Sequence, residues 1–161
     1  MSNSSFPESV RRAPVTLDDC GLAAASDLLG DRWTLLVIRE AFYGVARFDD
    51  LAADLGAPRA ALSDRLRALC EAGVLEKVAY REPGRRERHE YRLTACGRDL
   101  ALPLLGLMAW GDRWLRRQPP GAAAIDADVG RALQLALLDP DGRLVPAERL
   151  RLVPVTYTSS R

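Results

Sequence analysis

Histidine, lysine and cysteine are scarce in this chain of 161 residues, and their scarcity excludes several classes of protein. His89 is the only histidine, and it lies in the charged stretch RRERHEYRL. A histidine-containing triad, an HExxH zinc site or a histidine general base would each need this residue, which is poorly placed for a pocket. The sequence also has no GxxxxGK loop and no GxGxxG turn to bind a phosphate. We therefore expect that the protein is not an enzyme.

The cysteine content and the lack of long apolar runs bear on the compartment. Cys20, Cys70 and Cys96 form no CxxC pair, so we expect neither a disulfide framework nor a zinc knuckle, and we expect no metal and no cofactor. The longest stretch without a charge, residues 100–111, is shorter than the ~18 residues of a membrane span. Residues 1–5 lack the basic and apolar regions of a signal peptide. These features predict a cytoplasmic protein without a membrane partner.

Positive charge is concentrated in the middle of the chain. The net charge is only +1, but residues 57–98 carry ten basic and six acidic side chains. Residues 1–56 carry five basic and nine acidic side chains. Lys77 is the only lysine, so nearly all of this charge comes from arginine, which suits bidentate contacts with phosphate and guanine. GC-rich codon usage is the alternative explanation for the arginine content.

Capping residues divide the first third of the chain into an arm and two helices. Residues 1–15 are polar and have no period, which predicts a mobile arm. Thr16, Asp18 and Asp19 can cap a helix in LAAASDLLG, which Gly30 would end in a left-handed conformation. Asp31 can cap the next helix, RWTLLVIREAF, whose apolar spacing predicts a central place in the core.

The next segment has the spacing of a helix-turn-helix motif. A short helix follows Phe48, which would precede a cap at Asp49, and Gly56 ends it. In PRAALSDRLRALCEAG an apolar stripe lies on one face, while arginine and serine lie on another. The apolar stripe consists of Leu62, Leu66, Leu69 and Cys70, and the polar face of Arg59, Ser63 and Arg67. Two short helices joined by a turn of about three residues predict a DNA-reading motif.

A β-hairpin with a basic loop follows this motif. VLEKVAY and HEYRL are typical of strands, and REPGRRER between them contains a Pro-Gly turn. The loop and its flanks carry Arg81, Arg85, Arg86 and Arg88. Its position directly after the helix-turn-helix predicts a winged helix whose loop contacts DNA. The alternative is a solvated loop without a partner.

A long helix begins after Thr94 and is apolar nearly all round. Its segment LALPLLGLMAWG would pack on its own domain on one side and on a second subunit on the other. We expect a dimer interface at Leu100, Leu104, Leu107, Met108, Trp110 and Trp114. Pro103 removes the bond to the Asp99 carbonyl and should bend the helix. The alternative is a monomer in which the C-terminal tail covers the second face.

These segments predict an α+β fold with one main domain and an appendage. Residues 16–118 would form a winged helix-turn-helix domain with a long C-terminal dimerisation helix. Residues 119–161 begin with the linker Pro119-Pro120-Gly121 and continue with two apolar runs around Asp-Pro-Asp-Gly at 139–142. This pattern predicts a small C-terminal β-hairpin.

Several ordered signatures resemble one family of regulators. DLLGDRWTLLVIRE, RFDDLAADLG, LSDRLRALCEAGVL and HEYRLTACGRDL closely resemble the HxlR-type winged helix-turn-helix transcription regulators, relatives of the MarR group. The resemblance runs from about Cys20 to Trp114 and includes the pattern Tyr-x-Leu-Thr-x-x-Gly after the wing. It implies a homodimer that binds a pseudo-palindromic operator in double-stranded DNA and represses or activates transcription.

We assign roles in DNA binding to the exposed face of the second helix and to the wing. The first turns of that helix would contact base edges in the major groove. The later arginines would contact phosphates. The residues concerned are Arg59, Ala60, Ser63 and Asp64 for bases and Arg65 and Arg67 for phosphates, with Arg59 and Ser63 ranked first. Arg65 could instead pair with a carboxylate inside the domain. The wing arginines would follow the neighbouring minor groove and its phosphates.

Cys20 lies just before the first helix, where several members of the family that this chain resembles carry a sensing thiol. A helix N-terminus favours thiolate chemistry, whereas Asp18 and Asp19 beside it oppose this. Redox sensing by Cys20 is therefore weighed against a silent cysteine. Residues 121–161 lack the cysteines that some longer relatives carry, so we expect no zinc there.

Two other functions stay open at this point. The winged helix could serve as a protein-interaction module without DNA binding, although its outward arginines argue against this. The apolar dimer cavity around Met108, Trp110 and Trp114 could hold a small molecule, either as a binding protein or as the effector of a regulator. The sequence favours a transcriptional regulator, with repression as the expected action and a redox, electrophile or small-molecule signal.

Overall fold

The computed structural model describes residues 15–84 and 86–154. The described residues in 28–135 form one compact unit, and those in 15–27 and 136–154 belong to a second. Apart from Val15, the predicted mobile arm lies outside the described residues, as does Arg85 of the predicted wing. No helix in the described ranges is both long enough and apolar enough to span a bilayer.

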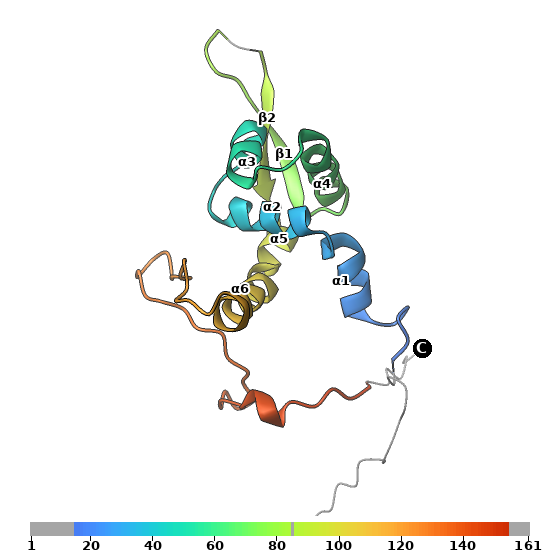
Figure 1. Ribbon diagram of the computed structural model, residues 1–161, viewed down its shortest axis with the longest axis vertical. Coiled ribbons are helices and arrows are strands. Elements are labelled where there is room, and N and C mark those ends of the chain that lie inside the picture. The colour runs from blue at the N-terminus through green and yellow to red at the C-terminus, as the bar shows by residue number, and fades with distance from the viewer. Residues whose placement is uncertain (1–14, 85, 155–161) are drawn as a thin grey trace, which may run out of the picture. The chain divides into compact units, whose positions relative to one another are not determined.

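The order of elements in residues 28–135 is that of a winged helix (Figure 1). The helix α1 (Gly21–Leu29) leads into this unit. It is followed by α2 (Arg32–Phe42), α3 (Phe48–Leu55), α4 (Arg59–Glu71), β1 (Leu75–Tyr80), β2 (Arg88–Leu93), α5 (Ala95–Asp99) and α6 (Ala101–Trp110). A π-helix (Gly111–Arg116) continues α6. The fold is α+β, as the sequence predicts.

Helix α2 lies at the centre of the core, which confirms the prediction for this segment. Asp31 caps it, because its carboxylate oxygen accepts hydrogen bonds from the backbone amides of Trp33 at 2.9 Å and Thr34 at 3.3 Å. Val37 and Ile38 are at most 1% exposed and belong to the buried cluster of the domain. Burial of such aliphatic side chains is the main source of folding free energy.

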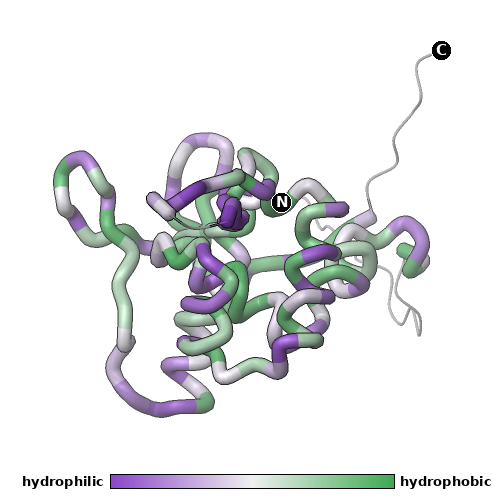
Figure 2. The backbone as a smooth tube through the Cα atoms, turned by 90° about the horizontal axis from the view of Figure 1, so that it is seen from above, coloured by the Kyte–Doolittle hydropathy of each residue, from purple (hydrophilic) through white to green (hydrophobic). Residues whose placement is uncertain are grey.

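Helix α4 is amphipathic in the way its spacing predicts. Leu62, Leu66 and Leu69 are buried in the same cluster as the core of α2. Arg59 and Ser63, on the other face, are exposed. Figure 2 shows hydrophobic and hydrophilic positions alternating along the helical turns. Helix α4 therefore presents a polar face to solvent because its apolar stripe packs against α2 and β1.

The wing is an antiparallel hairpin with an additional short pairing at its edge. Leu75 pairs with Leu93 at the base of the hairpin, and Tyr80 pairs with Arg88 next to the loop. The segment before α3 runs along β2, since the Tyr91 amide donates to the Ala46 carbonyl at 2.8 Å and Arg47 forms a bridge with Glu90. The wing is thereby attached to the start of the helix-turn-helix.

The predicted long helix is divided into α5 and α6 at Leu100. Thr94 caps α5, because its side-chain oxygen accepts a hydrogen bond from the Gly97 amide at 3.1 Å. Pro103 has no amide to bond the Asp99 carbonyl, and the helix is interrupted close to that carbonyl. The structure thus shows an interruption of the helix close to the position of the predicted bend.

Gly97 allows α5 to pack closely on the base of the hairpin. A Cβ at this position would lie 2.2 Å from the Val74 carbonyl oxygen and 2.9 Å from Leu93 Cδ2. We expect Gly97→Ala to lower the free energy of unfolding by about 2–3 kcal/mol, because overpacking against backbone forces the helix away. Urea denaturation measures this, with Gly21→Ala, where nothing lies within 4 Å, as the control. A Gly97 variant as stable as this control would contradict the packing argument.

Two local predictions near the helix starts are wrong. Gly30 does not adopt a left-handed conformation, since the turn between α1 and α2 is made by the extended residue Asp31, with φ −91° and ψ 137°. Asp49 does not cap α3, because this helix already begins at Phe48 after the extended residue Arg47. The carboxylate of Asp49 is therefore free to make contacts outside its own helix.

The C-terminal segment has the predicted turn, closed by one antiparallel bridge and two backbone hydrogen bonds, but within residues 136–154 the pairing is too short to form two strands. Asp139 accepts hydrogen bonds from the amides of Asp141 at 3.0 Å and Arg143 at 2.9 Å, and Leu138 forms a single bridge with Leu144. The chain leaves the pairing after Val145, and the 3₁₀-helix Ala147–Arg149 follows Pro146.

Candidate nucleic-acid interface

The first turns of α4 form the exposed surface on which most of the predicted base-reading residues lie. Gly56, with φ +61°, makes the turn that separates α3 from α4, and Pro58 precedes the first helical residue. Arg59, Ala60, Ser63, Asp64 and Arg67 are exposed, and Arg65 is half-buried. These side chains are accessible to a partner that docks on α4.

The arginines of α4 differ in their partners. Arg59 donates from Nη2 to Asp49 Oδ1 at 3.0 Å, and its guanidinium lies 4.6 Å from the centre of the Phe48 ring. Arg67 pairs with Asp64 within the helix at 2.8 Å. Arg65 Nε lies 4.0 Å from Asp31 Oδ1, which is the intradomain contact left open as an alternative. Among the described residues, Arg59 is the one arginine of these three with a hydrogen bond to α3.

The wing meets the same carboxylate from the other side. Arg88 Nη1 lies 3.4 Å from Asp49 Oδ2, so Asp49 joins the start of α4 to the end of the wing loop. Arg47 supports this region, since it pairs with Glu82 at 3.0 Å and lies 4.5 Å from the Tyr80 ring centre. Arg81 and Arg86 are exposed. The helix start and the wing therefore share one surface.

A polar groove of about 410 Å³ lies where α3, α4 and the wing meet. Arg59, Arg88 and Arg47 line it together with Asp49 and the only histidine, His89. Guanidinium groups at this position can donate hydrogen bonds to phosphate or to base edges. The sequence analysis missed the contribution of Asp49 and Arg47, and the RFDD signature around them was the only signal that could have pointed to it.

The predicted dimer residues fall into two groups in the structure, apart from Met108, which is half-buried and lines an apolar cavity. Leu100 and Leu104 pack against the core of their own domain. Leu107, Trp110 and Trp114 are 53%, 54% and 56% exposed, which is unusual for such large apolar side chains. These three residues, which we call the Leu107 surface, are candidates for contact with a second chain.

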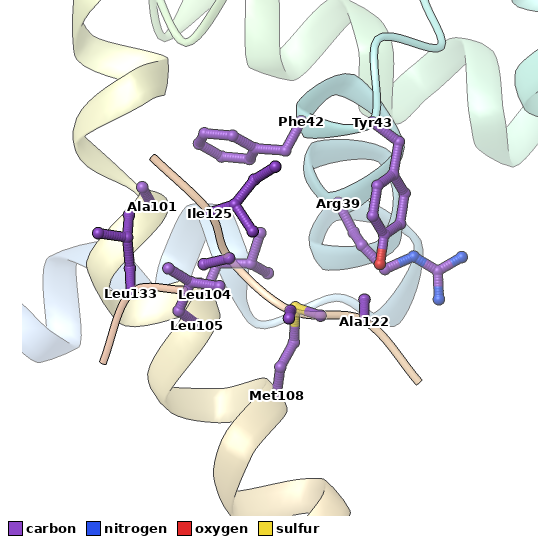
Figure 3. A pocket seen from close by; sticks show the side chains of 12 residues that line it. Arg39, Phe42, Tyr43, Ala101, Leu104, Leu105, Met108, Ala122, Ile125 and Leu133 are labelled. Carbon is purple, nitrogen blue, oxygen red and sulfur yellow. The ribbon is translucent and has the colours of Figure 1, made fainter. Parts of the chain in front are cut away.

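An apolar cavity of about 370 Å³ lies between α2, α6 and the chain segments at residues 122–125 and 133 (Figure 3). Phe42 from α2, Leu104, Leu105 and Met108 from α6, and Ile125 line it. The guanidinium of Arg39 points away from these apolar side chains in the figure and pairs with the buried Glu40. The cavity is suited to an apolar compound.

The three cysteines are separate and differ in environment. Cys20 is half-buried, and its carbonyl accepts a bond from the Ala24 amide at the start of α1. Burial raises the pKa of the Cys70 thiol, which opposes the reactive thiolate, although Lys77 lowers the pKa in part. Cys96 is exposed. Within the described residues no three His, Cys, Asp or Glu side chains cluster as metal ligands.

Known regulators are similar to this chain in sequence. The HxlR-like helix-turn-helix family matches residues 28–119. The HTH-type transcriptional regulator Mb3122 of Mycobacterium bovis is 55% identical over 93 residues, which are 58% of each chain. The HTH-type transcriptional regulator sll1512 of Synechocystis is 35% identical over 100 residues, 62% of this chain and 73% of the relative. The chain thus spans little more than half the length of Mb3122.

Solved structures also share the fold. The candidate transcription factor PA1607 is 33% identical with a TM-score of 0.69, over 83% of this chain and 94% of the other. The reduced form of the transcriptional regulator YodB from B. subtilis is 27% identical with a TM-score of 0.52. The match covers 64% of this chain and 98% of the YodB chain. The ordered signatures, the winged-helix elements and these matches lead to one conclusion: the chain belongs to the HxlR-like helix-turn-helix family.

Proposed function

We propose that the protein is a dimeric, sequence-specific DNA-binding regulator of transcription. The observation that carries the proposal is that Arg59 of α4 and Arg88 of the wing meet on Asp49, so that both DNA-reading elements share one surface. Family membership and the relatives described as transcriptional regulators support it. In this proposal residues 16–118 form the DNA-binding and dimerisation domain, and residues 119–161 extend it.

The proposed mechanism divides DNA recognition between α4 and the wing. Arg59, Ala60, Ser63 and Asp64 would face base edges in the major groove, while Arg65 and Arg67 contact phosphates. Arg81, Arg85, Arg86 and Arg88 would lie along the adjacent minor groove, where they add affinity more than sequence choice. Bound at a promoter, the protein would compete with the polymerase, so we propose repression.

Dimerisation would place two α4 helices in successive major grooves about 34 Å apart on a pseudo-palindromic operator. The Leu107 surface supports this, because three large apolar side chains within two turns of helix are exposed in a single chain. Ala122 lines a cavity together with Leu107, but Leu107, Trp110 and Trp114 each stay more than half exposed.

Two features support control of DNA binding by a signal. The half-buried Cys20 at the start of α1 is the candidate for an oxidant or electrophile, and the apolar cavity is the candidate for a small-molecule effector. Measuring operator binding with and without diamide tests the role of Cys20. The Cys20→Ser variant is the control. Release from DNA that persists in Cys20→Ser would assign the signal elsewhere.

Salt dependence tests whether the wing contributes electrostatic contacts to DNA. We expect Arg85→Ala with Arg86→Ala to weaken binding to every duplex and to reduce the slope of log K against log salt by about 1–2, since each phosphate contact releases counterions. Fluorescence anisotropy over a range of salt concentrations measures this slope. Arg98→Ala removes an exposed arginine at the opposite end of the hairpin and should leave the slope unchanged. An unchanged slope in the wing variant would contradict the assignment.

A further inference from the structure

We propose that Asp49 is a specificity-determining residue that holds Arg59 in position for a guanine. The inference rests on the proposed function and extends it to a residue that does not itself read a base. Asp49 stands in α3, outside the recognition helix, and its carboxylate contacts one arginine from α4 and one from the wing. It acts through Arg59 and is therefore a positioning residue.

Arg59 is restrained on two sides although its side chain is 68% exposed. Asp49 Oδ1 accepts a hydrogen bond from Nη2 at 3.0 Å, and the Phe48 ring lies under the guanidinium at 4.6 Å. Both restraints come from adjacent residues of α3, so they fix the direction as well as the place of the guanidinium. A flexible arginine on a helix surface would otherwise sample many rotamers.

The restraint leaves Arg59 able to read a base. A guanidinium has five N–H donors, and the bond to Asp49 uses one of them. Within the described residues, Nε and Nη1 of Arg59 make no hydrogen bond. Guanine offers two acceptors, O6 and N7, to a pair of such donors. Nη2 has a second N–H, which lies beside Nε–H or Nη1–H, so one edge of the guanidinium keeps the paired donors that guanine requires.

The negative charge of Asp49 explains why its contact with Arg59 improves discrimination between DNA sequences rather than affinity for all DNA. Exposed ion pairs contribute little to folding stability, so this pair is not needed to hold the domain together. A carboxylate on a DNA-facing surface also repels every phosphate that approaches. The repulsion is the same for all sequences, whereas the oriented Arg59 is favourable only where a guanine meets it. Asp49 thus lowers affinity for random DNA and raises discrimination.

Asp50 provides a matched control on the same helix. It is exposed, carries the same charge one residue further along, and within the described ranges makes no ion pair with an arginine. Replacing either aspartate with alanine removes one negative charge from α3. Only the Asp49 variant also releases Arg59.

The test compares both variants on two duplexes, one enriched by the wild-type protein from a random library and one a scrambled version of it. We expect Asp49→Ala to reduce the ratio of the two affinities about tenfold, since a misdirected arginine loses most of a bidentate base contact. Binding to the scrambled duplex should strengthen. Asp50→Ala should strengthen binding to both duplexes equally and leave the ratio unchanged. A ratio that is the same in both variants would overturn the proposal.

A second comparison shows whether Asp49 acts through Arg59. In an Arg59→Ala background, Asp49→Ala should leave the affinity ratio unchanged, because no arginine remains to be positioned. A further loss of ratio in that background would overturn the proposal, while equal thermal melting of the Asp49 and Asp50 variants excludes a folding defect as the cause. Failure of the proposed function is distinct, since the wild-type protein would then enrich no sequence from the library.

Discussion

Replacing Arg59 with alanine is expected to weaken binding to the selected duplex, the one enriched by the wild-type protein, by about 1–3 kcal/mol and to change binding to the scrambled duplex much less. The reason is that Arg59 lies in the first turn of α4 with its guanidinium directed by Asp49 and Phe48. Loss of a base contact affects only the sequence that contains the base. Anisotropy titration of both duplexes at one salt concentration measures the difference.

Arg67→Ala is the matched control for this experiment. Arg67 is exposed on the same helix, but it pairs with Asp64 within α4, and among the described residues it has no hydrogen bond or ion pair with α3. Because Arg67 is a proposed phosphate contact, Arg67→Ala should weaken binding to both duplexes by a similar factor. It should also reduce the slope of log K against log salt by about 1. An Arg59 variant that behaves in the same way as the Arg67 variant would show that Arg59 binds phosphate and reads no base.

Leu107→Glu is expected to convert the proposed dimer to monomers. The substitution places a charge on the Leu107 surface, one turn of helix before Trp110, and all three residues of this surface are more than half exposed in the single chain. Burying an unpaired carboxylate in an apolar interface is costly, and we expect the dimer dissociation constant to rise about 100-fold or more. Sedimentation equilibrium measures the mass, which should fall from twice 17.7 kDa to 17.7 kDa.

The same substitution at Leu102 provides the control. Leu102 is 67% exposed on the same helix, but a separation of five residues places it roughly 140° around the helix axis from Leu107. Leu102→Glu should leave the dimer intact. Monomers in both variants would contradict the assignment of the interface to one face of α6, and dimers in both would place the interface outside the Leu107 surface.

Elements with strong local signals could be predicted from the sequence. The cap at Asp31 depends on an oxygen within three residues of the amides it binds, and the stripe of Leu62, Leu66 and Leu69 depends only on helical periodicity. The break near Leu100 follows from the missing amide of Pro103. Each of these features is decided by neighbours along the chain, and each agrees with the structure.

Features that depend on distant partners could not be predicted in the same way. Asp49 contacts Arg59, ten residues away, and Arg88, 39 residues away, so no local pattern indicates that one carboxylate joins them. The C-terminal apolar runs have the composition of strands, but a strand also needs a partner along its length, and the pairing here stops where the 3₁₀-helix Ala147–Arg149 begins. Long-range pairing, rather than residue preference, decides both cases.

The central claim is that a dimer of this chain recognises a particular DNA sequence. The most direct test is an anisotropy titration of the wild-type protein against the selected and the scrambled duplex over several salt concentrations, with the stoichiometry determined. We predict tighter binding to the selected duplex, two chains per site and a steep salt slope. Absence of binding to either duplex at low salt would contradict the claim and would favour a winged helix that contacts another protein.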